Sequence, residues 1–419
     1  MNAAVASLVA FGLVVGVSCL SRLNVGVLSF LMAFALGHLF CGLPTAEVAA
    51  RFPGRLFLHL TGITLLFSLA AVNGTLNQVA WRAVRLVRAD PRLVTPIVFG
   101  LAVALASSGA GNFAAVAMLA PVAMGVAARS RVSPFLMAFM LVNGANAGAF
   151  SPLAPTGIVA SELMGRIGLE GNDWAVYLNS LAAHTMVALT GYLLLGGPRL
   201  FRLKAVAVDH AFEELSGAKA ALSRSQLFTI AAVLAFWVAT VGFRLDAGVV
   251  ALAGAALLIL AGAAEALAAI RGLPWGVILM VCGVATLVSV IETAGGMDLF
   301  AQFLAGFAGP AYLPGLAALV AGLMSVPASS IGVVLPALLP SVPSLLASLG
   351  GGNPLMVAFS INVGAHLVDI SPLSPLGAMC LAYAPPGEDR AALFRRLMAA
   401  GWAMALAGSL LCQFIFGFR

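Results

Sequence analysis

The residues that could do chemistry in this chain are polar side chains set inside long apolar segments. They form four clusters: Ser107-Ser108-Gly109-Ala110-Gly111-Asn112, Ala328-Ser329-Ser330-Ile331-Gly332, and two Ser-Pro-Leu segments that begin at Ser151 and Ser371. Polar groups are costly in lipid and therefore mark candidate functional sites. Two prolines three residues apart, such as Pro152 and Pro155, will unwind a helix. Unwound backbone at membrane depth offers carbonyls to a cation and helix N-termini to an anion.

Further polar residues flank these clusters and complete a candidate binding site. Each residue alone is more often a helix cap or an interhelical hydrogen bond than a ligand contact. Because the four clusters recur as two matching sets, we predict that together they form one site. Its candidate residues are Ser107, Ser108, Gly109, Asn112, Asn143, Asn146, Ser151, Thr156, Ser329, Ser330, Asn362, Ser371 and Ser374.

Two titratable residues distinguish the second half of the chain from the first. His366 and Asp369 precede Ser371, where the first half has Asn146 and Ala149. A carboxylate and an imidazole three positions apart share one face of a helix. A carboxylate inside a membrane segment is a candidate proton carrier or cation ligand. We therefore expect Asp369 to serve a coupling ion, and a purely structural His–Asp pair is the alternative.

The composition defines the medium in which these residues work. Of 419 residues, 62% are hydrophobic and 9% are charged, whereas soluble domains carry roughly 25% charged residues. So few charges exclude a soluble enzyme, a nucleic-acid-binding protein and a disordered chain. The formal charge of +6 does not indicate nucleic-acid binding, because the basic residues lie between apolar runs. The five cysteines lack metal-ligand spacing and are interpreted as small core residues.

The chain also contains an internal repeat. Several segments match in order at an offset of 220 to 222 positions. One such coincidence is weak in a Gly-rich and Leu-rich chain, but agreement on nearly one offset favours a duplication. The matched positions are Gly26 with Gly248, Gly62 with Gly283, Ser107-Ser108 with Ser329-Ser330, and Ser151 to Gly157 with Ser371 to Gly377.

Two of the four clusters, Ser107 to Asn112 and Ala328 to Gly332, are called here the first and the second tip. The short apolar runs on either side of each tip predict re-entrant hairpins. In each half, the fourth and fifth runs hold about 16 residues, which span roughly 24 Å of a hydrocarbon core of about 30 Å. We predict hairpins at 92–128 and 312–348, and broken helices at 132–166 and 354–382. The alternative is two ordinary short spans, which would give six crossings per half and a parallel repeat.

With hairpins, each half has five crossings, so the second half is inserted upside down. With the N-terminus outside, sixteen of the 21 Lys and Arg residues fall on the cytoplasmic side, as the positive-inside rule requires. The predicted fold is therefore an all-α polytopic membrane protein of two inverted repeats, each with five transmembrane helices and one re-entrant hairpin. The repeats are 1–196 and 225–419, with a cytoplasmic linker at 197–224, and the C-terminus also lies outside.

Two shorter segments complete this plan. Residues 4–20 are predicted to be a first span and not a signal peptide, because no basic residue precedes them. Residues 76–90 place Arg82, Arg85 and Arg88 three positions apart. They predict an amphipathic helix in the membrane interface that ties a moving hairpin to a fixed frame.

Three segments resemble the bacterial dicarboxylate carrier family of the malonate-carrier type. They run from Ser108 to Phe113, from Asn143 to Gly157 and from Val72 to Leu76. That family belongs to the ion transporter superfamily, together with the divalent anion/sodium symporters. The resemblance implies a dimeric elevator transporter of the bacterial inner membrane, in which hairpin tips meet the substrate carboxylates and adjacent loops hold sodium.

The resemblance also implies a division of roles within the site. Substrate binding falls to Ser107, Ser108, Gly109, Asn112, Asn143, Thr156, Ser329, Ser330 and Ser374. The residues that bind the coupling ion would be Asn143, Ser151 and Ser371. This sequence adds Asp369, with His366, to that set. The tips here lack the Ser-Asn-Thr of sodium-coupled relatives, so Na⁺ and H⁺ both stay open as the coupling ion.

The function predicted from the sequence is cation-coupled uptake of a small dicarboxylate, such as malonate or succinate, by an elevator mechanism without a cofactor. The expected partners are the dicarboxylate, the lipid bilayer and a second copy of the chain in a homodimer, and no nucleic acid. A cation/proton antiporter or an oxyanion exporter is the main alternative. An integral membrane enzyme is less favoured, because no metal or nucleophile constellation is present beyond His366 and Asp369.

Overall fold

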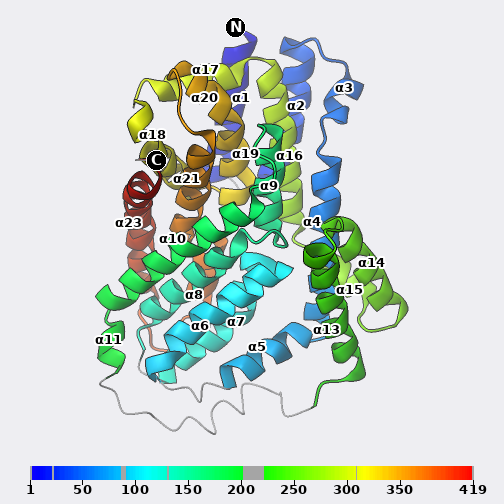
Figure 1. The fold of residues 1–419 in the computed structure, drawn as a ribbon, viewed down its shortest axis with the longest axis vertical. Helices are drawn as coiled ribbons and strands as arrows, with labels where there is room; N and C mark the ends of the chain where they lie inside the picture. Colours follow the sequence, from blue (N-terminus) through cyan, green and yellow to red (C-terminus); the bar gives the residue numbers. More distant parts are fainter. Residues whose placement is uncertain are drawn as a thin grey trace.

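A computed structural model of the protein describes residues 2–20, 23–85, 91–129, 132–201, 221–307 and 309–417, and these are helical without any strand. Figure 1 shows a tall helical bundle with the N-terminus at one end. Most of the predicted linker, residues 202–220, lies outside the described residues. So do several basic residues of the charge argument, namely Arg22, Arg88, Arg131, Arg202, Lys204, Lys219 and Arg419.

The helices of the two halves follow one another in the same order. The first half contains α1 (Ala3–Leu20), α2 (Val25–Phe40), α3 (Thr45–Ala50), α4 (Gly54–Val72), α5 (Thr75–Arg85), α6 (Pro91–Leu105), η1 (Ala106–Ala110), α7 (Gly111–Arg129), α8 (Pro134–Ala149), α9 (Pro155–Arg166), α10 (Asp173–Leu194) and α11 (Gly197–Leu200). The second half contains α13 (Arg224–Trp237), η2 (Val238–Gly242), α14 (Ala247–Leu260), α15 (Ala266–Arg271), α16 (Trp275–Thr293), α17 (Gly296–Ala305), η3 (Pro310–Tyr312), α18 (Leu313–Ser325), η4 (Ser330–Val334), α19 (Leu335–Leu338), η5 (Leu339–Ser341), α20 (Val342–Ser348), α21 (Pro354–Leu367), η6 (Val368–Ile370), α22 (Pro375–Ala382) and α23 (Arg390–Phe416).

Matched sequence signals start matched helices. The side chain of Asn24 accepts a hydrogen bond from the Gly26 N–H at the start of α2, and Asp246 accepts one from the Val249 N–H at the start of α14. Such side chains satisfy backbone donors that the first helical turn leaves unpaired. The duplicated sequence therefore carries duplicated helix boundaries.

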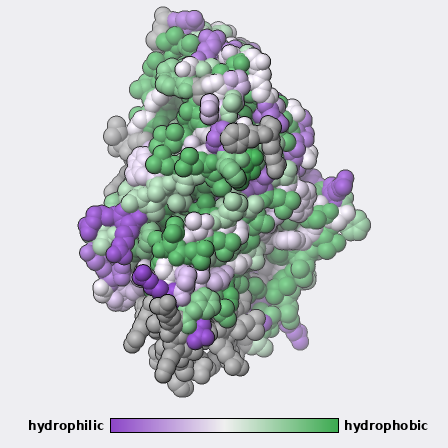
Figure 2. Space-filling model, turned by 60° about the vertical axis from the view of Figure 1, so that its left-hand side comes forward, coloured by the Kyte–Doolittle hydropathy of each residue, from purple (hydrophilic) through white to green (hydrophobic). Residues whose placement is uncertain are grey.

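The described helices define a multi-pass membrane protein. Seven are long and apolar enough to cross a membrane, or eight if one bent pair counts as a single span. The sequence predicts ten crossings, and part of the difference lies in shorter apolar helices. The helix α14, for example, has 14 residues and rises only about 21 Å. Figure 2 shows hydrophobic residues over most of the visible face, with hydrophilic ones gathered in patches at its ends and edges.

The two halves interlock through matched glycines. A Cβ atom on Gly283 of α16 would meet the backbone of Gly26 in α2, and one on Gly62 of α4 would lie 2.7 Å from the Gly248 carbonyl oxygen of α14. These four glycines are the pairs that the repeat matches. Each half thus packs its second helix against the fourth helix of the other half, at distances that only glycine permits.

Each broken helix turns in the same way. The Ser151 N–H donates to the Gly148 carbonyl at 3.2 Å, and the Ser371 N–H donates to the Val368 carbonyl at 2.9 Å. Both serine hydroxyls also accept the N–H two residues later, from Leu153 and Leu373, at 3.3 Å. The helix then restarts at a proline, where no backbone donor is needed.

The segments around the tips differ between the halves. The helices α6 and α7 lie side by side and turn at Gly109, whose φ is +111°. A Cβ there would lie 2.5 Å from the ring of Phe67, so the turn requires glycine. In the second half, prolines at 336, 340 and 343 divide the segment after the tip into η4, α19, η5 and α20.

Candidate functional site

The first tip and the first broken helix are in direct contact. The Ser151 hydroxyl donates to the Ser107 carbonyl oxygen at 2.8 Å, and both side chains are buried. The Ser108 hydroxyl donates to the Leu105 carbonyl at 2.7 Å and so holds the last turn of α6. The tip therefore presents backbone groups, while its two hydroxyls are already engaged.

Two aromatic side chains that the sequence did not single out hold this tip. The Tyr177 hydroxyl lies 3.0 Å from the Ser107 hydroxyl, and the Trp237 indole N–H donates to the Ser108 carbonyl at 3.0 Å. Tyr177 belongs to α10 and Trp237 ends α13, so segments from both halves reach the tip. Neither position repeats in the other half, and the duplication therefore gave no signal for them.

The second tip contacts the second broken helix through a carboxylate. The Ser330 hydroxyl donates to the Asp369 carboxylate at 2.7 Å, and the Ser325 hydroxyl lies 2.6 Å from that of Ser330. The side chains of Ser374 and Asn146 also interact with this carboxylate. Asp369 is thus surrounded by neutral oxygen-bearing or amide side chains, and it has only 7% of its surface exposed.

Asn146 connects the two broken helices at the centre of the site. Its amide donates to the His366 carbonyl at 2.9 Å, and its side-chain oxygen accepts from the Asn112 amide at 2.8 Å. Asn146 and His366 occupy matched positions of the repeat, so the two halves meet where they correspond. The sequence placed Asn146 among the supplementary residues, whereas the structure shows that its amide links the two halves.

The expected His366–Asp369 pair takes a different form. Asp369 follows α21 in the short turn η6 and faces Ser330, whereas the His366 Nδ1 lies 3.2 Å from the Asn362 carbonyl. The His366 ring packs edge-on against Phe150, with ring centroids 4.6 Å apart. Among the described residues, the two side chains make no hydrogen bond or ion pair with each other, and each contacts other groups.

Several predicted site residues make only local contacts. The Asn143 amide donates to the Phe139 carbonyl in its own helix, and the Ser329 hydroxyl caps η4 by accepting the Gly332 N–H. Thr156 is buried in the first turn of α9. The Ser371 hydroxyl faces the Met398 sulfur at 3.9 Å and not the second tip, unlike its counterpart Ser151.

The electrostatic character of the site follows from what surrounds it. None of the buried residues among those described is Lys or Arg. The N-termini of α7, α9 and α22 begin beside the tips and breaks, at Gly111, Pro155 and Pro375. Helix N-termini favour anions through their free N–H groups and their dipole. Backbone N–H groups and amides are thus the groups near the site whose chemistry suits an anion, and Asp369 is the carboxylate whose chemistry suits a cation.

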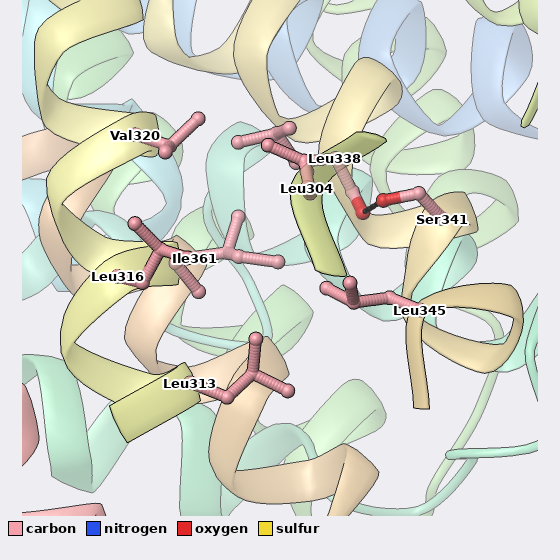
Figure 3. Close-up of a pocket in the computed structure, with 9 residues that line it drawn as sticks. Leu304, Leu313, Leu316, Val320, Leu338, Ser341, Leu345 and Ile361 are labelled. Carbon is pink, nitrogen blue, oxygen red and sulfur yellow. Dashed lines mark hydrogen bonds between the residues drawn. The ribbon is translucent and has the colours of Figure 1, made fainter. Parts of the chain in front are cut away.

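A small cavity near the second tip is not a ligand site. It lies between α18, α20 and α21 and has a volume of about 20 Å³. Figure 3 shows apolar side chains pointing toward one another around it, with the Ser341 hydroxyl bonded to the Leu338 carbonyl. Such a space holds about one water molecule and offers it no free polar partner.

Replacing Asn146 by leucine should destabilise the protein by about 2–4 kcal/mol, since two buried hydrogen bonds are lost and their partners stay buried. The measurement is the thermal unfolding midpoint of the detergent-purified protein. Asn143→Leu is the matched control, because Asn143 is equally buried on the same helix and bonds only a carbonyl of its own helix. Equal shifts for both variants would contradict the central role of Asn146.

The fold and the site together define a class of protein. Broken helices that meet polar tips inside a multi-pass helical bundle are the architecture of secondary transporters. The profile of the family described as the dicarboxylate carrier protein MatC N-terminus matches residues 1–149. This confirms the resemblance to the dicarboxylate carrier family over that part of the chain, which includes the first tip and α8, and it points to a transporter and not an enzyme.

Solved structures share the fold. The YdaH transporter of Alcanivorax borkumensis is 16% identical, with a TM-score of 0.57 over 88% of this chain and 87% of that chain. MtrF of Neisseria gonorrhoeae, described within a class of antimetabolite efflux pumps, is 13% identical, with a TM-score of 0.57 over 90% of this chain and 84% of that chain. No curated protein sequence matches the chain.

Proposed function

We propose that this protein is a secondary active transporter that takes up a small dicarboxylate, such as malonate or succinate, together with Na⁺ or H⁺. The observation that carries the proposal is the convergence of both tips and both broken helices around Asn146 and Asp369. The family match over residues 1–149 favours a dicarboxylate as the cargo. No cofactor takes part in this mechanism.

The chemistry of binding follows from the neutral site. The helix N-termini at Gly111, Pro155 and Pro375 attract carboxylates without a buried guanidinium. The Asp369 carboxylate, with the Ser330 and Ser374 hydroxyls near it, offers oxygen ligands of the kind that hard cations prefer. A cation or proton at Asp369 offsets the charge of the incoming anion, which couples the two movements.

An inverted repeat is the arrangement that best accounts for the helix directions. The helix α4 runs alongside α14 in the same direction, because His59 bonds Asp246 near both starts and Asn73 bonds the Ala263 carbonyl near both ends. Likewise Asn24, before α2, bonds the Gly276 carbonyl at the start of α16. The matched helices α5 and α17 lie at opposite ends of the molecule in Figure 1. These features favour two opposed halves, 1–196 and 225–419.

An elevator movement suits the contacts around the site. Most of the site side chains are buried, so a dicarboxylate reaches them only if a tip moves away from its broken helix. The helix α5 is amphipathic and its Arg82 is exposed, as expected for an interfacial helix that leads into the hairpin. We place the protein in the bacterial inner membrane as a homodimer, with both termini outside.

The test is uptake of labelled malonate and succinate into proteoliposomes with an imposed Na⁺ or proton gradient. The expected result is saturable uptake that one of the two gradients drives above the level without a gradient. Absence of uptake of every C3–C6 dicarboxylate under both gradients would refute the proposed function. Liposomes without protein provide the background.

Proton-driven antiport is the second candidate, and one observation favours it. Asp369 has no counterpart in the first half, where Ala149 stands at the matched position. A carboxylate among neutral hydroxyl and amide side chains suits a proton carrier that exchanges with its cargo. In the proteoliposome test, antiport predicts that the cargo is taken up against its own concentration gradient. The proton gradient that drives this uptake should have the direction opposite to the one that drives symport.

A further inference from the structure

A large cavity lies apart from the buried tips, between segments of the two halves. It has a volume of about 670 Å³, which is within the range of small-molecule sites. One wall comes from α4 and from residues 240–247, and the other from the first broken helix and the start of α10. Its polar lining contrasts with the apolar 20 Å³ cavity of Figure 3.

Two arginines line this cavity. Arg55 and Arg244 are exposed, and neither makes a hydrogen bond or ion pair with any residue in the described ranges. Arg244 also adopts a left-handed backbone with a φ of +54°, which is uncommon for a residue with a long side chain. It follows the π-helical turn η2, a feature frequent at functional sites.

Three carboxylates also line the cavity, and two of them are paired. Glu162 lies 3.6 Å from the Arg166 guanidinium. Asp246 lies 2.9 Å from the His59 ring; burial acts to raise the pKa of Asp246, but the Val249 N–H, His59 and the charge of Arg55 hold that pKa below its usual value. Asp173 sits in the first turn of α10, where a negative charge offsets the helix dipole. Glu162 and Asp246 thus have cationic or imidazole partners, whereas within the described ranges neither Arg55 nor Arg244 is held in an ion pair.

The cavity reaches the first tip through aromatic side chains. Pro152 and Leu153 of the first broken helix line it, as does Trp174. The Trp174 ring lies 6.0 Å from that of Tyr177, whose hydroxyl contacts Ser107. The side chains of Trp174 and Tyr177 would thus connect an anion in the cavity to Ser107 of the first tip.

We infer that this cavity is an entry site, distinct from the tips, that binds a small dicarboxylate through Arg55 and Arg244 before the substrate reaches Ser107 and Ser108. Guanidinium groups bind carboxylates in a planar, bidentate geometry. The identity of the ligand rests on the proposed function, whereas the site itself rests on the cavity and its arginines.

The first test is kinetic. Arg55→Gln and Arg244→Gln should each raise the KM for malonate uptake by about threefold to tenfold, with kcat within about twofold, because a rim charge acts mainly on capture. The KM of the unaltered protein should rise with ionic strength more steeply than that of the variants. Arg224→Gln is the matched control, because it removes one charge at the far end of α13. An unchanged KM, or a fall in kcat without a rise in KM, would overturn the inference.

The second test measures binding without transport. Malonate is titrated into the detergent-purified protein while tryptophan fluorescence is recorded, and the Trp174→Phe variant removes the signal of the cavity. Malonate should change the fluorescence of Trp174 in the unaltered protein. In the Arg244→Gln variant, that fluorescence change should be about tenfold smaller. A response equal in both proteins, or none in a protein that transports malonate, would contradict the entry site. A response in a protein that transports no dicarboxylate would keep the entry site and refute the proposed function.

Discussion

Replacing Asp369 by asparagine should abolish cation-driven accumulation of the substrate while leaving the protein folded. Asparagine keeps the shape and can still accept the Ser330 hydrogen bond, but it removes the negative charge. At about 4 Å and an effective dielectric constant of about 20, that charge attracts a cation by about 4 kcal/mol, which corresponds to about a thousandfold in affinity. We therefore expect uptake driven by the Na⁺ or proton gradient to fall at least about a hundredfold.

The thermal unfolding midpoint separates this effect from misfolding. Burying a charge is costly, so the Asp369→Asn variant should be at least as stable as the unaltered protein in detergent. Asp298→Asn provides the matched control, since Asp298 is an exposed residue of α17 that bonds Ser344 away from the site. Gradient-driven uptake that persists in Asp369→Asn with the same cation dependence would show that the coupling ion binds elsewhere.

The duplicated features of the fold were accessible from the sequence because each imposes a local constraint. Gly26 and Gly283 are glycines since the helices α2 and α16 touch there, and Gly248 and Gly62 repeat the same contact in the other half. The Ser-Pro-Leu segments recur because the same turn must form twice. When the same structural constraint acts at two places in the chain, the same residues recur there at a fixed offset, and the repeat makes both places visible in the sequence.

Contacts that break the duplication could not be predicted in this way. Tyr177 and Trp237 hold the first tip, but nothing in their spacing relates them to Ser107 or Ser108. The different partners of His366 and Asp369 depend on the segments packed around each side chain, which spacing alone does not reveal. Such contacts arise when distant segments meet, so they depend on the packing of the whole bundle.

The contact between the tip and the broken helix differs chemically between the two halves. In the first half, the break contacts the tip through a neutral bond from Ser151 to the Ser107 carbonyl. In the second half, the corresponding link runs through the Asp369 carboxylate to Ser330, while Ser371 faces Met398. The second link therefore contains a carboxylate where the first has only neutral groups.

Alanine at Gly157 or at Gly377 should impair both stability and transport, to a similar degree at the two positions. A Cβ on Gly157 would meet the Ser151 carbonyl oxygen, and one on Gly377 would meet that of Ser371. These obstacles are backbone atoms that hold the breaks, so the helix that restarts after each break must shift. Overpacking of this kind costs about 1–3 kcal/mol, and a displacement of about 1 Å at a binding site can lower the rate by about a hundredfold.

The matched control for this pair is Gly100→Ala in the middle of α6, where an added Cβ meets no atom within 4 Å. Alanine favours a helix over glycine by about 1 kcal/mol, so this variant should be slightly more stable and fully active. Thermal unfolding and malonate uptake in proteoliposomes measure the three variants side by side. If Gly157→Ala lost activity while Gly377→Ala behaved like the control, only the first break would shape the site, and the two-sided arrangement around Asn146 would have to be abandoned.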